Sequence, residues 1–376
     1  MSNKILLFSR DPGGANTITP LVNPLKAKGY QVRLFGKDAA LIRYEKAGLA
    51  GLDITRSIPN ITLDAIDSFI QLEAPDFIIT GTSADDFTEK FIWKVSTTRN
   101  IPCFAILDQW LNYGVRFSNY NLSELSHYAI DKIHPFLPTK ILVMDDYAKD
   151  EILKEGLDRS KVIVTGHPYF ELLVKTASSG ESLDFRKKYS ISESDFVLTY
   201  ASEPISGMYG GDSDHYLGYT ERTIFQHIVE TLDDIIGQTK KAIVFVIKLH
   251  PKENVQKYDE LIKLSGRNLN IIKDRDSDPW DVIRSSQAVC GMSSMFLIES
   301  VILNKPVISV QIGLSRENPF VLDRRGILKS VLTKEELSLS LRSIIIHGQR
   351  PTYRFEIIKN PINNVIRHME KYLCQN

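Results

Sequence analysis

Short apolar segments alternate along the whole chain with longer segments of mixed polarity. The apolar segments have the length of buried strands, and the segments between them carry apolar residues at helical spacing, as in 63–72 and 86–98. Alternation of this kind indicates parallel sheets covered by helices. The predicted strands are 5–9, 31–35, 76–80, 103–107, 140–144 and 162–164 in the first half, and 196–200, 242–247, 269–272, 288–290 and 306–310 in the second.

The two sets of strands predict two domains, which agrees with a length of 376 residues. The expected fold class is α/β, with two Rossmann-like domains that face each other across a cleft. We place the first domain at 1–174 and the second at 194–352, joined by a linker at 175–193 that is rich in serine and charged residues. The tail, 353–376, is expected to be helical and to pack back on the first domain.

The composition is that of an ordinary globular protein. Hydrophobic residues make up 43% and charged residues 24%, while Lys+Arg and Asp+Glu both number 46, so nothing points to a nucleic-acid partner. No apolar stretch reaches the length of a membrane span, and the N-terminal apolar run is too short for a signal peptide. We therefore expect a cytoplasmic protein that is able to contact the inner face of a membrane. Three scattered cysteines, Cys103, Cys290 and Cys374, predict free thiols.

The strongest candidate site lies in the second half, where a polar segment follows each of two predicted strands. His250-Pro251-Lys252 follows the strand 242–247, while Ser293 and Ser294 follow the strand 288–290 and open a helix. Because the carboxyl ends of parallel strands lie at one edge of a sheet, these residues are expected to converge on one ligand. Free N–H groups at a helix start suit phosphate, and a histidine opposite is placed to give a proton to it.

Structural roles stay open for both motifs. A histidine at a strand end can bond a neighbouring loop, and serine is a common helix N-cap. The second serine, and Gly291 shortly before the pair, favour phosphate binding. Lys252 and Glu253 are expected to be solvated loop charges, although Lys252 is also placed to assist a phosphate. The segment 203–219, with its glycines and tyrosines, is expected to be a flexible lid.

Glu299 lies on the same predicted helix as the serines and has apolar neighbours. A buried acid needs a partner, and the paired hydroxyls of a ribose are the preferred one. The candidate nucleotide and phosphate contacts are therefore His250, Pro251, Lys252, Ser293, Ser294 and Glu299.

Two strand ends of the first half supply candidate general bases and sugar contacts. Asp11 precedes Gly13 and Gly14, which permit close approach of the backbone to a ligand, although a structural turn is the alternative. Asp108 opens a segment in which aromatic residues alternate with amide and charged groups, as in a sugar-binding wall or an anchored long loop. The candidate bases are Asp11 and Asp108, and the candidate acceptor or sugar contacts are Gly13, Gly14, Asn16, Trp110, Asn112, Tyr113 and Arg116.

Other ligand classes lack a sequence signal. No clustered set of His, Cys and Asp has metal-ligand spacing, so we expect no metal site. Neither a GxGxxG fingerprint nor a Walker A sequence occurs, which excludes the common dinucleotide and P-loop modes of binding.

These motifs resemble those of the GT-B superfamily of sugar-nucleotide enzymes. His250-Pro251 followed by Ser293-Ser294 is similar to bacterial sialyltransferases, polysialyltransferases, capsule Kdo transferases and CDP-glycerol-type teichoic-acid polymerases. In those families the histidine and the serines engage the phosphate of the donor, and no metal is needed. Glu299 followed by Lys305-Pro306-Val307 also resembles the non-hydrolysing UDP-N-acetylglucosamine 2-epimerases.

The resemblance implies a metal-independent glycosyltransferase of surface-polysaccharide assembly, with no cofactor besides its nucleotide-activated sugar. A CMP-, CDP- or UDP-linked donor would bind the second domain, and a glycan acceptor would bind the first. His250 would stabilise the leaving phosphate, while Asp11 or Asp108 would deprotonate the acceptor hydroxyl. Two alternatives stay open: an epimerase or hydrolase of the sugar nucleotide, of the UDP-GlcNAc 2-epimerase type, and a non-catalytic nucleotide-sugar-binding subunit.

Overall fold

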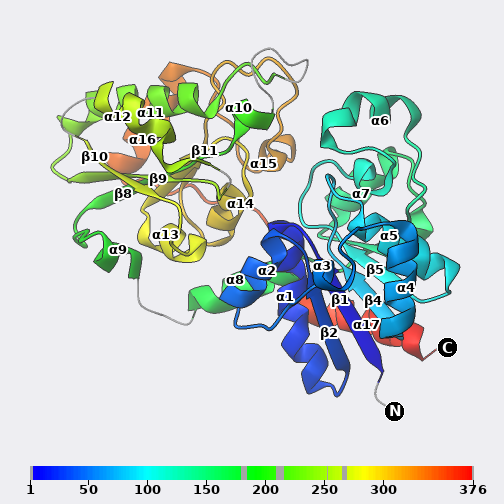
Figure 1. The fold of residues 1–376 in the computed structure, drawn as a ribbon. Coiled ribbons are helices and arrows are strands. Elements are labelled where there is room, and N and C mark those ends of the chain that lie inside the picture. Colours follow the sequence, from blue (N-terminus) through cyan, green and yellow to red (C-terminus); the bar gives the residue numbers. More distant parts are fainter. Residues whose placement is uncertain (1–2, 179–183, 209–215, 252, 265–268, 375–376) are drawn as a thin grey trace. The chain divides into compact units, whose positions relative to one another are not determined.

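The computed structural model describes residues 3–178, 184–208, 216–251, 253–264 and 269–374. The chain divides into two compact units, of which the first comprises Met1–Leu172 and Glu356–Asn376 and the second comprises Leu173–Phe355. Each unit is a parallel sheet with helices around it (Figure 1), which confirms the predicted fold class of two Rossmann-like α/β domains.

The first unit is built on a seven-stranded sheet with the order β3-β2-β1-β4-β5-β6-β7. All neighbouring strands are parallel, and the order changes direction between β1 and β4. The strands are β1 (Lys4–Ser9), β2 (Gln31–Gly36), β3 (Leu52–Asp53), β4 (Phe77–Thr80), β5 (Cys103–Ile106), β6 (Lys140–Val143) and β7 (Val162–Val164).

Helices cover the first sheet, and α1 packs against α17 over a common apolar core. Pro12 occupies the first turn of α1, where its missing N–H costs nothing. The helices are α1 (Pro12–Ala27), α2 (Ala39–Lys46), α3 (Ile54–Ser57), α4 (Leu63–Glu73), α5 (Thr88–Thr98), α6 (Leu125–Asp131), α7 (Asp146–Lys154) and α17 (Pro361–Leu373), with short 3-10 turns at Gly114–Phe117, Leu122–Glu124 and Arg159–Lys161; α8 (Pro168–Ser178) carries the chain from the first unit into the second.

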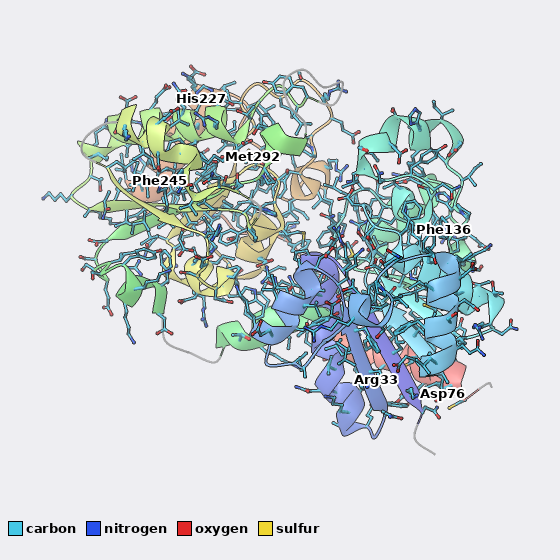
Figure 2. The ribbon with its side chains drawn as sticks, viewed as in Figure 1. Arg33, Asp76, Phe136, His227, Phe245 and Met292 are labelled. Atoms are coloured by element: carbon cyan, nitrogen blue, oxygen red, sulfur yellow. The ribbon has the colours of Figure 1, made fainter. Side chains whose placement is uncertain are left out.

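The second unit is built on a five-stranded parallel sheet with the order β10-β9-β8-β11-β12. The strands β8 and β9 are buried along their whole length, and Phe245 (Figure 2) is completely buried in the core. The elements are α9 (Asp184–Lys188), β8 (Phe196–Ala201), α10 (Ile205–Met208), α11 (Glu221–Ile236), β9 (Ile243–Lys248), a 3-10 turn at Val255–Tyr258, α12 (Asp259–Leu264), β10 (Asn270–Asp274), α13 (Pro279–Ser285), β11 (Ala288–Gly291), α14 (Met295–Ile302), β12 (Val307–Ser309), α15 (Val321–Arg324) and α16 (Lys334–Ile345).

Three local predictions need correction. The segment around Gly13 and Gly14 is not a loop, because α1 begins at Pro12 and both glycines lie in its first turn. The tail is not helical from residue 353, since its helix begins at Pro361 after Asn360 in the left-handed region, with φ of 53°. The segment 175–193 contains the end of α8 and all of α9.

Candidate functional site

Each sheet has a topological switch point, where the chain changes the direction in which it adds strands. In the first sheet the switch lies between β1 and β4, and in the second between β8 and β11. Ligands of doubly wound folds bind outside the carboxyl ends of the strands at such a point. The residues that follow these four strands are therefore the natural components of a site.

At the second switch point, the carboxylate of Glu203 sits on the segment that precedes α14. Its Oε1 accepts hydrogen bonds from the backbone N–H of Met292 at 3.1 Å and of Ser293 at 2.8 Å. Its Oε2 accepts a hydrogen bond from Ser293 Oγ at 3.0 Å. Met292, marked in Figure 2, is the first residue of the link between β11 and α14. The hydrogen-bond donors before α14 are thus occupied by a side chain of the protein, that of Glu203.

Burial sets the protonation of Glu203. The side chain is 8% exposed, and desolvation raises its pKa to about 7, while the hydrogen bonds from Ser293 and Met292 oppose that rise. Its negative charge is therefore held by N–H and O–H donors, and it titrates near neutral pH. Sequence reasoning placed Glu203 in a lid; the only available signal was an acid directly after a buried strand. Residues 209–215 of that lid lie outside the described part of the chain.

Ser294 has the structural role of a helix N-cap, which was one of the two roles considered for it. It is the N-cap of α14, and its Oγ accepts a hydrogen bond from the N–H of Phe296 at 3.2 Å. Ser293, by contrast, is engaged by Glu203. Glu299 lies buried on α14 as expected from its apolar neighbours, and its contact with a ribose stays a prediction.

His250 follows β9, and its loop is fixed by Glu253. The carboxylate of Glu253 accepts the N–H of His250 at 2.8 Å, the hydroxyl of Ser202 at 2.8 Å and the ammonium of Lys257 at 2.5 Å. Glu253 is 5% exposed, so the prediction of a solvated loop charge is wrong for it. The sequence could not reveal that a lysine four residues later would neutralise it. Lys252 lies outside the described residues.

His250 and the serine pair share one sheet edge but do not follow neighbouring strands. The order of the second sheet places β8 between β9 and β11. The end of β8 contributes Ser202 and Glu203, and these two residues contact the His250 loop and the start of α14 respectively. Pro251 is exposed in the turn after His250. Convergence of His250 with Ser293 and Ser294 on one ligand stays a prediction.

Beside the first switch point, Asp108, which follows β5, forms a buried ion pair with Arg116. Arg116 Nη1 donates to Asp108 Oδ1 at 2.9 Å and also to the hydroxyl and carbonyl of Thr82, after β4. Burial raises the pKa of Asp108 above its usual range, although Arg116 opposes this. Gly13 lies against Asp108, since a Cβ there would come within 1.8 Å of Asp108 Oδ2. The first turn of α1 therefore approaches this carboxylate only because residue 13 is glycine.

Asp11 lies near Asp108, and Glu89 lies near Asp11. Asp11, the residue before α1, is partly exposed and forms an ion pair with Arg10 at 3.0 Å. Glu89, in the first turn of α5, is completely buried and accepts the N–H of Arg10 at 3.1 Å. Desolvation, followed by the charges of Asp11 and Asp86, raises the pKa of Glu89 to about 8. Sequence reasoning missed Glu89, since a glutamate at a helix start has the pattern of an ordinary exposed cap.

The predicted sugar wall after Asp108 does not present its rings to solvent. Trp110 is 2% exposed, stacks on Phe170 and donates its indole N–H to Asp145, the N-cap of α7. Tyr113 is likewise buried. The anchored-loop alternative therefore describes these aromatic residues better than a sugar-binding wall.

The remaining sugar contacts proposed for this unit are placed as follows. Asn112 is half-buried with φ of 54°, and its carbonyl accepts a hydrogen bond from Arg116 Nε at 3.0 Å. Asn16 is half-buried on α1, while Gly14 packs against Gly81. Their contacts with a sugar stay predictions.

Two further features concern the described residues only. Within the described ranges, no group of three or more His, Cys, Asp or Glu side chains is placed to hold a metal ion. None of the helices traced in those ranges combines the length and apolar character needed to cross a membrane.

Comparison with known proteins gives a structural likeness without a sequence match. No protein-family model and no curated protein sequence matches the chain. UDP-GlcNAc 2-epimerase from Neisseria meningitidis, bound to UDP-GlcNAc, has a TM-score of 0.67 at 16% identity, covering 99% of this chain and 100% of that one. UDP-GlcNAc 2-epimerase from Methanocaldococcus jannaschii has a TM-score of 0.66 at 17% identity, covering 98% and 99%. MurG from Acinetobacter baumannii has a TM-score of 0.56 at 10% identity, covering 98% and 99%.

These likenesses contradict the prediction of a glycosyltransferase. Similar structures from several organisms are UDP-GlcNAc 2-epimerases, which supports the alternative over the leading hypothesis. The histidine and serine motifs misled because the chemistry expected of them, phosphate binding, does not define the reaction that follows. At these identities the shared property is the fold: the chain has the two-domain Rossmann-like architecture of GT-B-like UDP-sugar enzymes.

Proposed function

We propose that this protein is a nucleotide-sugar 2-epimerase that acts on a UDP-linked N-acetylhexosamine. The observation that carries the proposal is the likeness to UDP-GlcNAc 2-epimerases over almost the full length of both chains. A fold alone does not define a reaction, so the residues at the two switch points must also be suited to epimerisation.

The first unit supplies groups suited to proton transfer. Epimerisation at C2 requires removal of the C2 proton, whose electron pair forms a C1=C2 double bond as the C1–O bond to UDP breaks. UDP then adds back to C1 while a proton returns to C2 from the other face. Asp108 fits this need because burial raises its pKa, while Arg116 fixes its orientation. We assign proton transfer to Asp108 and the orientation of its carboxylate to Arg116.

The second unit supplies groups suited to a nucleotide diphosphate. The N–H groups before α14 and the hydroxyl of Ser293 form a set of donors that already holds one carboxylate. We assign the diphosphate to this segment and to His250, and we expect no metal and no bound cofactor.

Incubation with UDP-GlcNAc and no acceptor tests the proposal. Proton NMR in D₂O is expected to show formation of the 2-epimer, UDP-N-acetylmannosamine, with deuterium at C2. Release of free UDP and sugar would indicate a hydrolase instead. Absence of conversion and of deuterium exchange would exclude both reactions.

Asp108→Asn is expected to lower the rate of epimerisation by about 10²-fold or more, a typical loss for a general acid or base. UDP binding should persist, because that site is assigned to the second unit. Asp150→Asn, at an exposed position on α7, is the matched control and should keep the full rate. An Asp108→Asn enzyme with an unchanged rate would remove Asp108 from the mechanism.

A further inference from the structure

The Glu203 carboxylate occupies the hydrogen-bond donors that precede α14. Three donors surround it, namely the N–H groups of Met292 and Ser293 and the hydroxyl of Ser293. It reaches them because β8 and β11 are neighbours, so that the residue after β8 is beside the start of α14. A carboxylate and a phosphate use the same kind of donor.

Glu203 is not needed to cap α14. Ser294 already performs that role through the N–H of Phe296. Among the described residues, none of the contacts of Glu203 is with a cation. Burying a carboxylate without a neutralising partner is costly, and the rise of its pKa to about 7 expresses that cost. A purely structural reason for an acid at this position is therefore lacking.

We propose that Glu203 is an internal substitute for a ligand phosphate, which occupies the donors before α14 and must release them when an anionic ligand binds. This inference rests on the proposed function, because that function places the diphosphate at α14. Glu203 then acts as a competing anion, so it lowers affinity for the nucleotide and makes that affinity adjustable.

The backbone around Glu203 is anchored, so release is a rotation of the side chain. On one side, the N–H of Ser202 donates to the carbonyl of Lys248 at 2.9 Å. On the other, the N–H of Ser206 donates to the carboxylate of Glu221 at 2.8 Å. A glutamate has three side-chain torsions, and these can move the carboxylate while both anchors hold.

The surroundings of Glu203 make its release dependent on pH. Tyr200 on β8 is the titratable group that interacts with the charge of Glu203, and Tyr200 in turn neighbours Tyr258 in the 3-10 turn and Glu221 at the start of α11. Burial raises the pKa of both phenols, so they stay neutral below pH 9, and Glu221 is ion-paired with Lys257. Protonation of Glu203 therefore weakens its hydrogen bonds with the donors, while the charges of the neighbouring groups stay the same. Ligand binding consequently favours protonated Glu203.

UDP-GlcNAc is the probe, because it has no group that titrates between pH 6 and 8. Isothermal titration calorimetry on the full chain compares wild type with Glu203→Gln and with Glu260→Gln, an exposed glutamate on α12. For a pKa of about 7, wild-type affinity should fall about ten-fold more between pH 6 and 8 than that of Glu203→Gln. Glu203→Gln should bind more tightly than wild type at pH 8, while Glu260→Gln should match wild type.

Equal affinities and equal pH dependence in wild type and Glu203→Gln would overturn the inference. Sulfate, which also keeps its charge over this range, is the second probe and reports the anion position without the sugar. If Glu203→Gln bound neither sulfate nor UDP-GlcNAc, the inference would also be overturned. If binding changes as expected but no variant epimerises UDP-GlcNAc, the inference stands and the proposed function fails.

Discussion

Glu89 is a carboxyl group buried completely in the first unit. Its Oε1 accepts one hydrogen bond from Arg10, and its Oε2 has no hydrogen-bond partner among the described residues. The nearby acids Asp11 and Asp86 add to the effect of burial, and the pKa of Glu89 rises to about 8. At neutral pH the group is therefore mainly protonated in the folded state and ionised in the unfolded state.

Stability should consequently fall as pH rises between about 5 and 8. The folded state binds more protons than the unfolded state in this window, so the free energy of unfolding decreases with pH. Glu89→Gln resembles the protonated form and should reduce that decrease. Urea unfolding followed by tryptophan fluorescence tests this, since Trp93 and Trp110 both lie in the first unit.

The matched control for Glu89 is Glu45→Gln, at an exposed position on α2. It should show the same pH dependence as wild type. The raised pKa of Glu203 also makes the free energy of unfolding fall as pH rises. The pH dependence of Glu89→Gln must therefore be compared with that of wild type and of the control, and not with a pH-independent stability. Parallel curves for wild type and Glu89→Gln would contradict the prediction.

Glu253 is a buried acid of a second kind, because hydrogen-bond donors and an ammonium group surround its carboxylate. It accepts hydrogen bonds from His250, Ser202 and Lys257, and Lys257 is shared with Glu221. Glu253→Ala should lower the free energy of unfolding by about 2–3 kcal/mol, because it leaves buried donors unpaired. Chemical denaturation followed by circular dichroism is the measurement, with Glu260→Ala as the exposed control. A loss no larger than that of the control would refute this role.

The sequence predicts some residue roles and not others. Ser294 as an N-cap follows from serine before an apolar helix, and His250 at a strand end follows from the proline after it. Glu203 and Trp110 could not be assigned, because their partners are reached through the sheet order and through packing. Met292 and Asp145 are distant in sequence from the residues that bond them.

At the scale of elements, glycines set how closely α1 approaches the sheet. Gly14 in the first turn of α1 packs against Gly81, which follows β4. A Cβ at Gly81 would come within 2.7 Å of the Cα of Gly14, which is shorter than any normal contact with a backbone atom. The N-terminal end of α1 therefore lies directly over the first switch point.

Gly81→Ala should destabilise the first unit by roughly 1–3 kcal/mol, a common cost of inserting a methyl group into a packed site. Gly237→Ala is the control, because Gly237 has helical torsions and nothing within 4 Å of an added Cβ. The same tryptophan-detected unfolding applies. The close packing of α1 would be in doubt if the two variants had equal stability.

Apolar runs predict the strands well, whereas helix starts depend on a few backbone positions. The strands from β1 to β12 lie on or beside the predicted segments, except for the two-residue β3. The predicted start of the tail helix at residue 353 is wrong, because α17 begins at Pro361. Asn360, in the left-handed region just before Pro361, separates the helix from the preceding segment. Such a torsion has no strong signature in sequence.

At the scale of the whole molecule, the two units differ in how the chain builds them. The second is one continuous segment, while the first needs Glu356–Asn376 in addition to Met1–Leu172. The added segment contributes α17, whose residues Ile362, Val365, Ile366 and Met369 are buried in the core of the first sheet. Composition and length predict two domains. The packing of the tail on the first domain was a separate expectation, and α17 of that tail lies in the core of the first unit.

Val365→Asp should therefore unfold the first unit and spare the second. An aspartate at this position would be buried without a partner, at a cost of several kcal/mol, which is comparable to the whole stability of a domain. Asn363→Asp places the same charge on the exposed face of α17 and should leave both units folded. Amide hydrogen exchange separates the units, since β1 should lose protection in Val365→Asp while β8 keeps it. Loss of protection in both strands would mean that the two units fold as one cooperative body, and protection of both would mean that α17 adds little to the first core.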